Sequence, residues 1–257
     1  MQTSTTSSKE LNGQVAIVTG SSSGIGRATA LALASAGADL VVHAAHQREG
    51  VDATAKQVRD WGQEAIVVMA DFYDPAQVHA LAEQSWNWRG GVDILVNNAG
   101  AEVLMGSAAK AAYDEKLHRL WQIDVLGSIR LARSIGQRMQ ARGRGVIVNI
   151  GWDQIDSGMA GDTGELFATT KGAVTAFTRS LAKSLAPQVR VNCVAPGWIK
   201  TAWGESASQA WQERAKNESL LARWGTPEDV AQAIRFIASP QASFVTGQVI
   251  SVNGGRV

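Results

Sequence analysis

The feature that most constrains this chain is an alternation of short apolar runs with helical patterns. Amphipathic helical patterns occupy about residues 25–36, 51–61, 75–88, 111–141 and 163–185. Between and around them lie seven apolar runs, rich in Val and Ile, at 15–20, 39–44, 65–70, 93–98, 145–150, 189–194 and 247–252. Most runs are nearly continuous, as expected for strands covered on both faces. The alternation predicts an α/β fold with a doubly wound, mostly parallel seven-stranded sheet and helices on both faces.

Length, net charge and cysteine content limit the classes of function that this chain can have. The chain has 257 residues, 45 % of them hydrophobic, and no linker or repeat divides it, so we expect one domain over residues 11–257. Residues 1–10 are rich in Ser and Thr and are expected to form a mobile tail. A net charge of +1 gives no electrostatic argument for a nucleic acid or an anionic membrane as partner. The absence of a long apolar segment and the single Cys193 favour a cytoplasmic protein, and no metal site is predicted.

Two helix starts have sequence signatures. In "DTGE", Asp162 is expected to be the N-cap of a helix with Glu165 at its third position, as in a capping box. In "GTPEDV", Thr226 is expected to cap a later helix that begins at Pro227.

The first strand ends in a glycine-rich loop, "TGSSSGIG", at residues 19–26, and a helical pattern follows at once. Glycines let the backbone turn tightly and approach a phosphate, and the start of the helix offers free N–H groups. The alternative is an ordinary strand-to-helix turn. The place of the loop, after the first strand of an α/β chain, favours the phosphate-binding interpretation.

Three further motifs lie in order along the chain: "NNAG" at 97–100, a lysine on a helix at Lys171, and "VNCVAPGWIKT" at 191–201. Together with the loop spacing GxxxGxG, they resemble the short-chain dehydrogenase/reductase family over almost the whole length. The resemblance implies a Rossmann-type fold and a nicotinamide cofactor. It implies cofactor contacts at Gly20, Ser22, Gly24, Ile25 and Gly26 (pyrophosphate), Asp71 (adenine), Asn98, Ala99 and Gly100 (the NNAG wall), Lys171 (ribose), and Pro196, Gly197, Ile199 and Thr201 (carboxamide and phosphate).

The second strand bears on which nicotinamide nucleotide is used. An acid at its end would bind the ribose 2′-hydroxyl of NAD, but Ala44 and Ala45 stand there. His46 and Arg48 follow within reach of a 2′-phosphate. NADP(H) is therefore favoured over NAD(H), with the alternative that these two side chains are solvated and the site accepts both.

Three of the four residues that carry the chemistry in the family differ here. Asp124 stands where the resemblance implies Asn, Trp152 where it implies Ser, and Phe167 where it implies the Tyr that moves a proton. Of the four, Lys171 alone matches. Because a carbonyl that becomes an alkoxide needs a donor, ordinary ketone reduction should be slowed about 10²- to 10⁴-fold by the missing acid alone.

Three carboxylates are candidates to replace the missing acid. Asp124 is placed to pair with Lys171 or relay a proton to it, unless it only keeps a polar helix position. Asp153 follows a strand end and either faces the substrate or lies in solvent. For Glu165, capping its own helix is the better interpretation.

The chain also has nine Trp residues, a high number for its length. Trp152, Trp198, Trp203 and Trp211 fall in segments that border the substrate in the family, and they are candidates for an aromatic pocket. The alternative is that several of them pack in the core or at an interface.

Three functions stay open. The first is an atypical NADP(H)-dependent oxidoreductase that acts on C=N bonds in imines or on another apolar or aromatic substrate. The second is a catalytically silent NADP(H)-binding sensor or partner subunit, and the third is a non-redox acid–base enzyme on the same fold. The resemblance also implies a homo-oligomer, a dimer or a tetramer, formed through the long helices.

Overall fold

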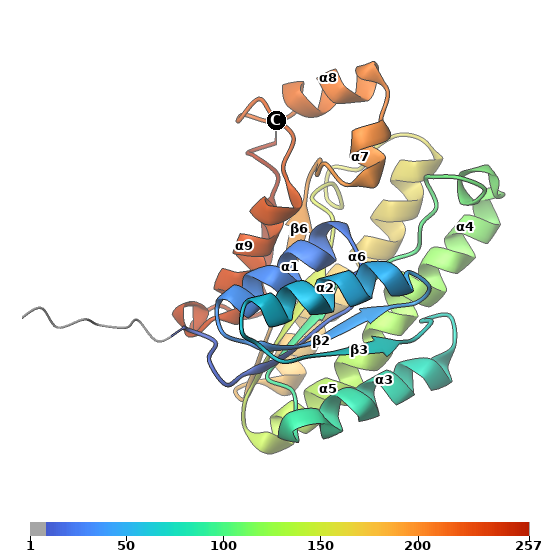
Figure 1. The fold of residues 1–257 in the computed structure, drawn as a ribbon. Coiled ribbons are helices and arrows are strands. Elements are labelled where there is room, and N and C mark those ends of the chain that lie inside the picture. The colour runs from blue at the N-terminus through green and yellow to red at the C-terminus, as the bar shows by residue number, and fades with distance from the viewer. Residues whose placement is uncertain (1–8, 257) are drawn as a thin grey trace, which may run out of the picture.

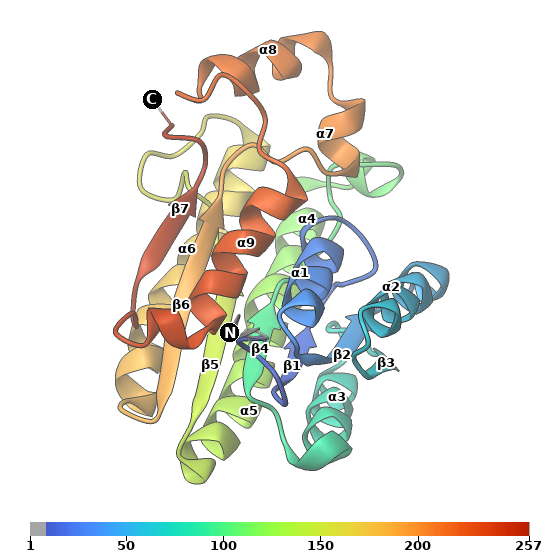
Figure 2. The ribbon, with the colours of Figure 1, turned by 60° about the vertical axis from the view of Figure 1, so that its left-hand side comes forward.

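The structure, a computed structural model, describes residues 9–256; residues 1–8, most of the expected mobile tail, and Val257 lie outside the described residues. The described chain forms one seven-stranded sheet with helices on both faces (Figures 1 and 2). Its strands are β1 (Val15–Val18), β2 (Asp39–Ala44), β3 (Ala65–Met69), β4 (Ile94–Asn97), β5 (Gly145–Ile150), β6 (Val189–Pro196) and β7 (Val249–Val252). Within residues 9–256 there is no helix long and apolar enough to cross a membrane.

The strand order is β3-β2-β1-β4-β5-β6-β7, and every neighbouring pair is parallel. The predicted doubly wound sheet is therefore confirmed. The chain runs outward from β1 to β3, returns to the middle at β4, and runs outward the other way to β7. The order thus reverses between β1 and β4, and in open α/β sheets ligands bind at the carboxyl ends of the strands at such a point.

The helices form two layers (Figures 1 and 2). One layer holds α1 (Gly24–Ser35), α2 (Arg48–Asp60) and α9 (Pro227–Ala238), and the other holds α3 (Pro75–Asn87), α5 (Ser128–Arg142) and α6 (Asp162–Leu185). Successive strand residues point to opposite faces, so Val18 and Val42 pack under the first layer and Ile17 and Val41 under the second. Short 3₁₀ turns lie at Trp88–Gly90, Ala108–Lys110 and Pro240–Ala242.

Two further helices, α7 (Ala202–Ser206) and α8 (Gln209–Asn217), lie beyond the carboxyl ends of the strands, at the top of Figure 2. They belong to neither layer. They carry Trp203 and Trp211, which pack against each other and line a cavity at this end of the sheet.

The helix expected over residues 111–141 is present without a break from Tyr113 to Arg142, but it is not α-helical throughout. It consists of α4 (Tyr113–Leu120), a π-helical segment (Trp121–Gly127) and α5. The sequence did not reveal this segment, because a π-helix is defined by its wider hydrogen-bond pattern and no residue type marks it. Such π segments are frequent at functional sites, and this one carries Asp124.

One of the two predicted helix starts is right and one is wrong. Thr226 caps α9 in a complete capping box with Asp229, and Pro227 is its first residue. At α6, however, Gly161 is the N-cap and Asp162 is already helical. Gly161 has a φ of 91°, a conformation that favours glycine, and so the chain turns into the helix one residue earlier than the sequence suggested.

His43 on β2 joins the sheet to the glycine-rich loop. The Gly20 backbone N–H donates to its Nδ1 at 3.1 Å, and its Nε2 lies 2.8 Å from the carbonyl oxygen of Ala70, to which it donates. This pattern requires the neutral ring. The side chain is 1 % exposed, and burial lowers the pKa of His43 from 6.5 to about 4, against the opposing effects of the Ala70 carbonyl and the Asp71 charge.

We expect the free energy of unfolding to fall by about 3 kcal/mol between pH 6.5 and 4 through this group alone. In that window the unfolded chain binds a proton at His43 that the folded chain excludes, so stability is lost as the pH falls. Urea unfolding at a series of pH values measures the slope. His79→Gln, a change at an exposed histidine, should keep the slope, and His43→Gln should flatten it. An unchanged slope in His43→Gln would contradict the assignment.

Candidate active site

The loop between β1 and α1 is folded tightly against the end of β4. Asn98 Nδ2 donates to the carbonyl oxygens of Thr19 and Gly20 at 2.9 and 3.2 Å. Thr19 Oγ1 in turn accepts from the backbone N–H groups of Asn98 and Ala99 at 2.9 and 3.0 Å. A Cβ on Gly26 would lie 2.1 Å from the Gly20 carbonyl oxygen, so only glycine permits this approach. The loop and the NNAG wall, predicted separately, are one hydrogen-bonded unit.

This unit leaves the start of α1 open. The N-cap residue, Ser23, makes no side-chain cap hydrogen bond, and so the first backbone N–H groups of α1 are available to an anion. The five residues predicted to hold the pyrophosphate surround this helix start: Gly20 and Ser22 lie in the loop before α1, and Gly24, Ile25 and Gly26 form its first turn.

The side chains predicted to meet a 2′-phosphate lie near the end of β2 and are each near a carboxylate. Arg48 Nε is 2.8 Å from Asp52 Oδ2, an exposed pair within α2. His46 Nε2 is 3.7 Å from Oδ2 of Asp71, the residue predicted to meet the adenine. Exposed pairs of this kind contribute little, so neither basic group is firmly held.

Arg27 is a part of the loop that the sequence analysis missed. Its guanidinium donates to the carbonyl oxygens of Ser22 and Gly50, and its Nε donates to Thr54 Oγ1 at 3.2 Å. It therefore ties the loop to α2. Its place directly after the last loop glycine was the only available signal.

Lys171 and Asp124 form a buried ion pair beneath the NNAG wall. Lys171 Nζ lies 2.9 Å from Asp124 Oδ2, with the two side chains 12 % and 2 % exposed. Asp124 Oδ1 accepts from the backbone N–H of Ala101 at 2.7 Å. A Cβ on Gly100 would come within 2.9 Å of Asp124 Oδ2, which explains the glycine there. The pairing considered for Asp124 is thus what the structure shows.

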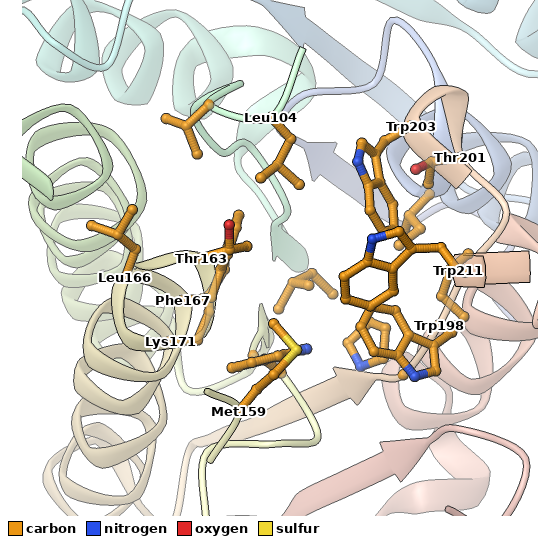
Figure 3. Close-up of a pocket in the computed structure, with 18 of the residues that line it drawn as sticks. Leu104, Met159, Thr163, Leu166, Phe167, Lys171, Trp198, Thr201, Trp203 and Trp211 are labelled. Atoms are coloured by element: carbon orange, nitrogen blue, oxygen red, sulfur yellow. The ribbon is translucent and has the colours of Figure 1, made fainter. Parts of the chain in front are cut away.

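A cavity of about 480 Å³ opens beside Lys171, at the carboxyl ends of β5 and β6 (Figure 3). Its lining includes six residues predicted to bind the cofactor: Ile25, Lys171, Pro196, Gly197, Ile199 and Thr201. The rest of the lining is mainly apolar: Val103, Leu104, Ala109, Lys116, Ile150, Gly151, Trp152, Met159, Asp162, Thr163, Leu166, Phe167, Trp198, Trp203 and Trp211. One part of the cavity is thus lined by residues expected to bind the cofactor, and the rest by mainly apolar side chains.

Trp152 and Phe167 line this cavity together with Lys171. Their ring centroids are 6.2 Å apart. The two positions where the family resemblance implies hydroxyl groups therefore present aromatic carbon to the cavity.

Three indoles face Phe167 and Lys171 across the cavity, as Figure 3 shows. Trp198 follows β6, Trp203 lies on α7 and Trp211 on α8. Ring centroids within this group are 5.1 to 6.2 Å apart, so the indoles pack on one another. Together we call them the aromatic wall. Trp224 packs behind Trp198 at 6.4 Å, and the sequence analysis did not single it out.

The candidate carboxylates are placed differently. Asp153 is not among the lining residues: its Oδ2 accepts from Asn253 Nδ2 at 3.1 Å, and burial raises the pKa of Asp153 against that hydrogen bond. Glu165 is exposed on the first turn of α6. Asp162 and Lys116, which the sequence analysis did not propose, line the cavity instead, and Lys116 Nζ donates to the Ala109 carbonyl oxygen at 2.6 Å. The sequence marked Asp162 only as a helix cap and did not mark Lys116, because tertiary packing alone brings them to the cavity.

Known proteins resemble this chain over nearly its full length. A family model described as enoyl-(acyl carrier protein) reductase matches residues 20–256. An uncharacterised oxidoreductase from Methylorubrum extorquens is 37 % identical over 250 residues, covering 96 % of this chain and 98 % of that protein. A 3-oxoacyl-(acyl-carrier-protein) reductase from Aquifex aeolicus is 36 % identical over 251 residues, with the same coverage of 96 % and 98 %.

Solved structures agree with these matches. A 7α-hydroxysteroid dehydrogenase in complex with NADH and 7-oxo glycochenodeoxycholic acid superposes with a TM-score of 0.86 at 30 % identity, over 97 % of this chain and 96 % of that one. A double mutant of a Serratia marcescens short-chain dehydrogenase/reductase gives a TM-score of 0.86 at 30 % identity, over 96 % and 98 %. Likeness of this degree, in sequence and in fold together, shows that the chain belongs to the short-chain dehydrogenase/reductase family of oxidoreductases.

Proposed function

We propose that this protein is an NADP(H)-dependent oxidoreductase with a non-standard site, and that its substrate contains a C=N bond, as an imine or iminium, in an apolar or aromatic molecule. When bound, the nicotinamide cofactor supplies or accepts a hydride. Everything else must come from the side chains of the cavity.

The residues present fit such a nucleotide. The Gly26 position admits no Cβ, and the open start of α1 favours an anion. The NADH complex of the 7α-hydroxysteroid dehydrogenase, which has the same fold, supports a nicotinamide nucleotide as the ligand. The lack of an acid at Ala44 and Ala45, with His46 and Arg48 close by, supports NADP(H).

The cavity offers little help to a ketone. A carbonyl that is reduced acquires negative charge on oxygen and needs a nearby donor. Trp152 and Phe167 put carbon at the two positions in question. The Lys171 ammonium is held by Asp124 at 2.9 Å, so that giving up its proton would leave a buried carboxylate without its partner.

A protonated C=N group avoids this need, because it brings its own proton and becomes a neutral amine. The aromatic faces of Trp152, Phe167 and Trp198 attract a cation, and the Asp162 carboxylate adds negative charge. Since the Lys171–Asp124 pair is neutral as a whole, it does not repel the substrate. Lys116 does, and the substrate cation is therefore expected nearer to Asp162.

Two alternatives remain as outcomes of the tests below. The loss of both hydroxyl positions also suits a silent NADP(H)-binding sensor or partner subunit. The buried Lys171–Asp124 pair would serve a non-redox acid–base enzyme if its proton could move. Self-association as a dimer or tetramer and a cytoplasmic location stay predictions.

The first test concerns the cofactor. NADPH should bind about tenfold more tightly than NADH, because Arg48 can exchange a weak surface pair with Asp52 for a charge-assisted bond to phosphate. Calorimetric titration of both nucleotides measures the ratio. Arg48→Ala should remove most of it, and Lys56→Ala, which breaks the similar Lys56–Asp60 pair farther along α2, should not. Equal affinities in the unaltered protein would refute the NADP(H) assignment.

The second test concerns the buried pair. Lys171→Met leaves Asp124 buried without a cation and should lower the free energy of unfolding by about 3–5 kcal/mol. The double change with Asp124→Asn should restore most of this stability, as urea unfolding would show. If Lys171 also binds the ribose, the double variant still loses nucleotide affinity, whereas Asp124→Asn alone keeps it. A double variant that binds NADPH normally would remove Lys171 from the cofactor site.

The third test compares substrates of one shape. Dihydroisoquinoline, a cyclic imine, should be turned over with NADPH at least about 100-fold faster than tetralone, the matching ketone, because only the ketone needs the missing acid. Initial rates between about pH 5 and 8 should rise toward the pH at which the imine is protonated. Faster tetralone reduction would overturn the proposal, and silence toward both would favour the sensor.

Restoring the hydroxyls provides a control for this third test. Trp152→Ser with Phe167→Tyr should raise tetralone turnover by more than the two single changes combined, since both hydroxyls would serve one oxygen. Phe177→Tyr, elsewhere on α6, should change nothing.

A further inference from the structure

Trp198 is the centre of the aromatic wall. Its ring lies 5.1 to 6.4 Å from those of Trp203, Trp211 and Trp224, and it also lines the cavity. The guanidinium carbon of Arg214 packs 5.6 Å from the Trp198 ring and 4.8 Å from the Trp211 ring. The orientation of this one indole therefore shapes the surface that a substrate meets.

A single carboxylate fixes that orientation. The Trp198 indole Nε1–H donates to Glu218 Oε2 at 2.8 Å, and Arg214 Nε donates to Glu218 Oε1 at 2.7 Å. Burial alone would raise the pKa of Glu218, but the hydrogen bonds from Arg214 and Trp198 and the charges of Arg214 and Arg256 outweigh it and lower the pKa. Glu218 is thus ionised and able to hold several donors at once.

Arg256, four residues beyond β7, joins this carboxylate to the loop between β5 and α6. Its Nε lies 3.4 Å from Glu218 Oε2, an ion pair without hydrogen-bond alignment, and its Nη1 donates to Ser157 Oγ at 3.4 Å. Ser157 belongs to the loop between β5 and α6, which carries Trp152 into the cavity. The Arg256 and Glu218 side chains are 18 % and 22 % exposed, so water screens their pairing only in part.

The backbone holds Arg256 in this place. Leu220 N–H donates to the Gly255 carbonyl oxygen at 3.1 Å, and Leu221 N–H donates to that of Gly254 at 3.2 Å. The segment after β7 is therefore bound to the segment after α8. The backbone at Arg256 is therefore held close to Glu218, and the arginine side chain reaches the carboxylate from there.

From these contacts we infer that Arg256 is a positioning residue for the substrate cavity: it acts through Glu218 to set the Trp198 indole and so couples the aromatic wall to the loop that carries Trp152. This inference rests on the proposed function only in taking the cavity as the substrate site. The other charges near Arg256 are Asp153, which Asn253 holds, and Arg214 on the far oxygen of Glu218. Arg256 therefore replaces no catalytic group, and its effect is on geometry.

Fluorine NMR of the protein labelled with fluorotryptophan tests the geometry directly, and Trp198→Phe assigns the Trp198 line. Arg256→Met should move or broaden that line, and Arg256→Lys, which keeps the charge, should restore it. Glu218→Gln keeps an oxygen for the indole N–H but loses the charge that holds Arg256, so it should also move the line. The matched control is Arg235→Met, which breaks the Arg235–Glu10 pair of similar burial at the far end of α9. A Trp198 line that stays in place in Arg256→Met would overturn the inference.

Binding provides the second measurement, with dihydroisoquinoline as the probe and tryptophan emission as the signal. Arg256→Met should weaken binding about tenfold and leave NADPH affinity within about threefold. In a Trp198→Phe background it should have almost no further effect, since the indole N–H through which it acts is gone. Additive losses would overturn the inference. If the unaltered protein does not bind the probe, the proposed substrate class is wrong. The fluorine resonance of Trp198 then still tests whether Arg256 positions the indole.

Discussion

Four hydrogen bonds between the ends of β1 and β4 organise this molecule. They join Thr19 and Gly20 to Asn98 and Ala99 and bring the glycine-rich loop against the NNAG wall where the strand order reverses. Because all seven strands are parallel, their carboxyl ends meet at this one edge. The loops that follow β4, β5 and β6 therefore lie next to one another at this edge. The His43 ring also holds this loop, because its Nδ1 accepts a hydrogen bond from the Gly20 backbone N–H.

At that edge the buried Lys171–Asp124 ion pair lies beneath aromatic side chains that line the cavity. Lys171 stands where a family member is expected to hold the cofactor ribose, but the carboxylate of Asp124 compensates its charge within the protein. Trp152 and Phe167 place aromatic carbon above this pair. The outcome is a cavity with a neutral ion pair at its base and a mainly apolar lining, and the proposal of a C=N substrate rests on this combination.

The aromatic wall depends on polar contacts for its shape. Because α7 and α8 lie outside both helix layers, Trp203 and Trp211 pack on each other and line the cavity, and neither belongs to the two large core clusters. Glu218 supplies the missing constraint with hydrogen bonds to Trp198 and Arg214, and Arg256 connects it to the segment after β7. We infer that these polar contacts set how the Trp198 ring lies against Trp203 and Trp211.

The sequence alone determined the seven strands, the parallel sheet, the loop and wall motifs and the cap at Thr226, because these depend on local periodicity, on glycine conformation and on side chains that bond to their own backbone. It also showed that hydroxyl groups are missing at Trp152 and Phe167. Only the tertiary structure decided that α6 begins one residue early, at Asp162 with Gly161 as its cap, and that a π segment presents Asp124 to Lys171. It also decided that Asp162 and Lys116 line the cavity while Asp153 accepts a hydrogen bond from Asn253. These outcomes depend on pairs that lie far apart in the chain, such as Glu218 with Arg256 or Arg256 with Ser157. Packing sets the distances between such side chains, and no pattern along the sequence records them.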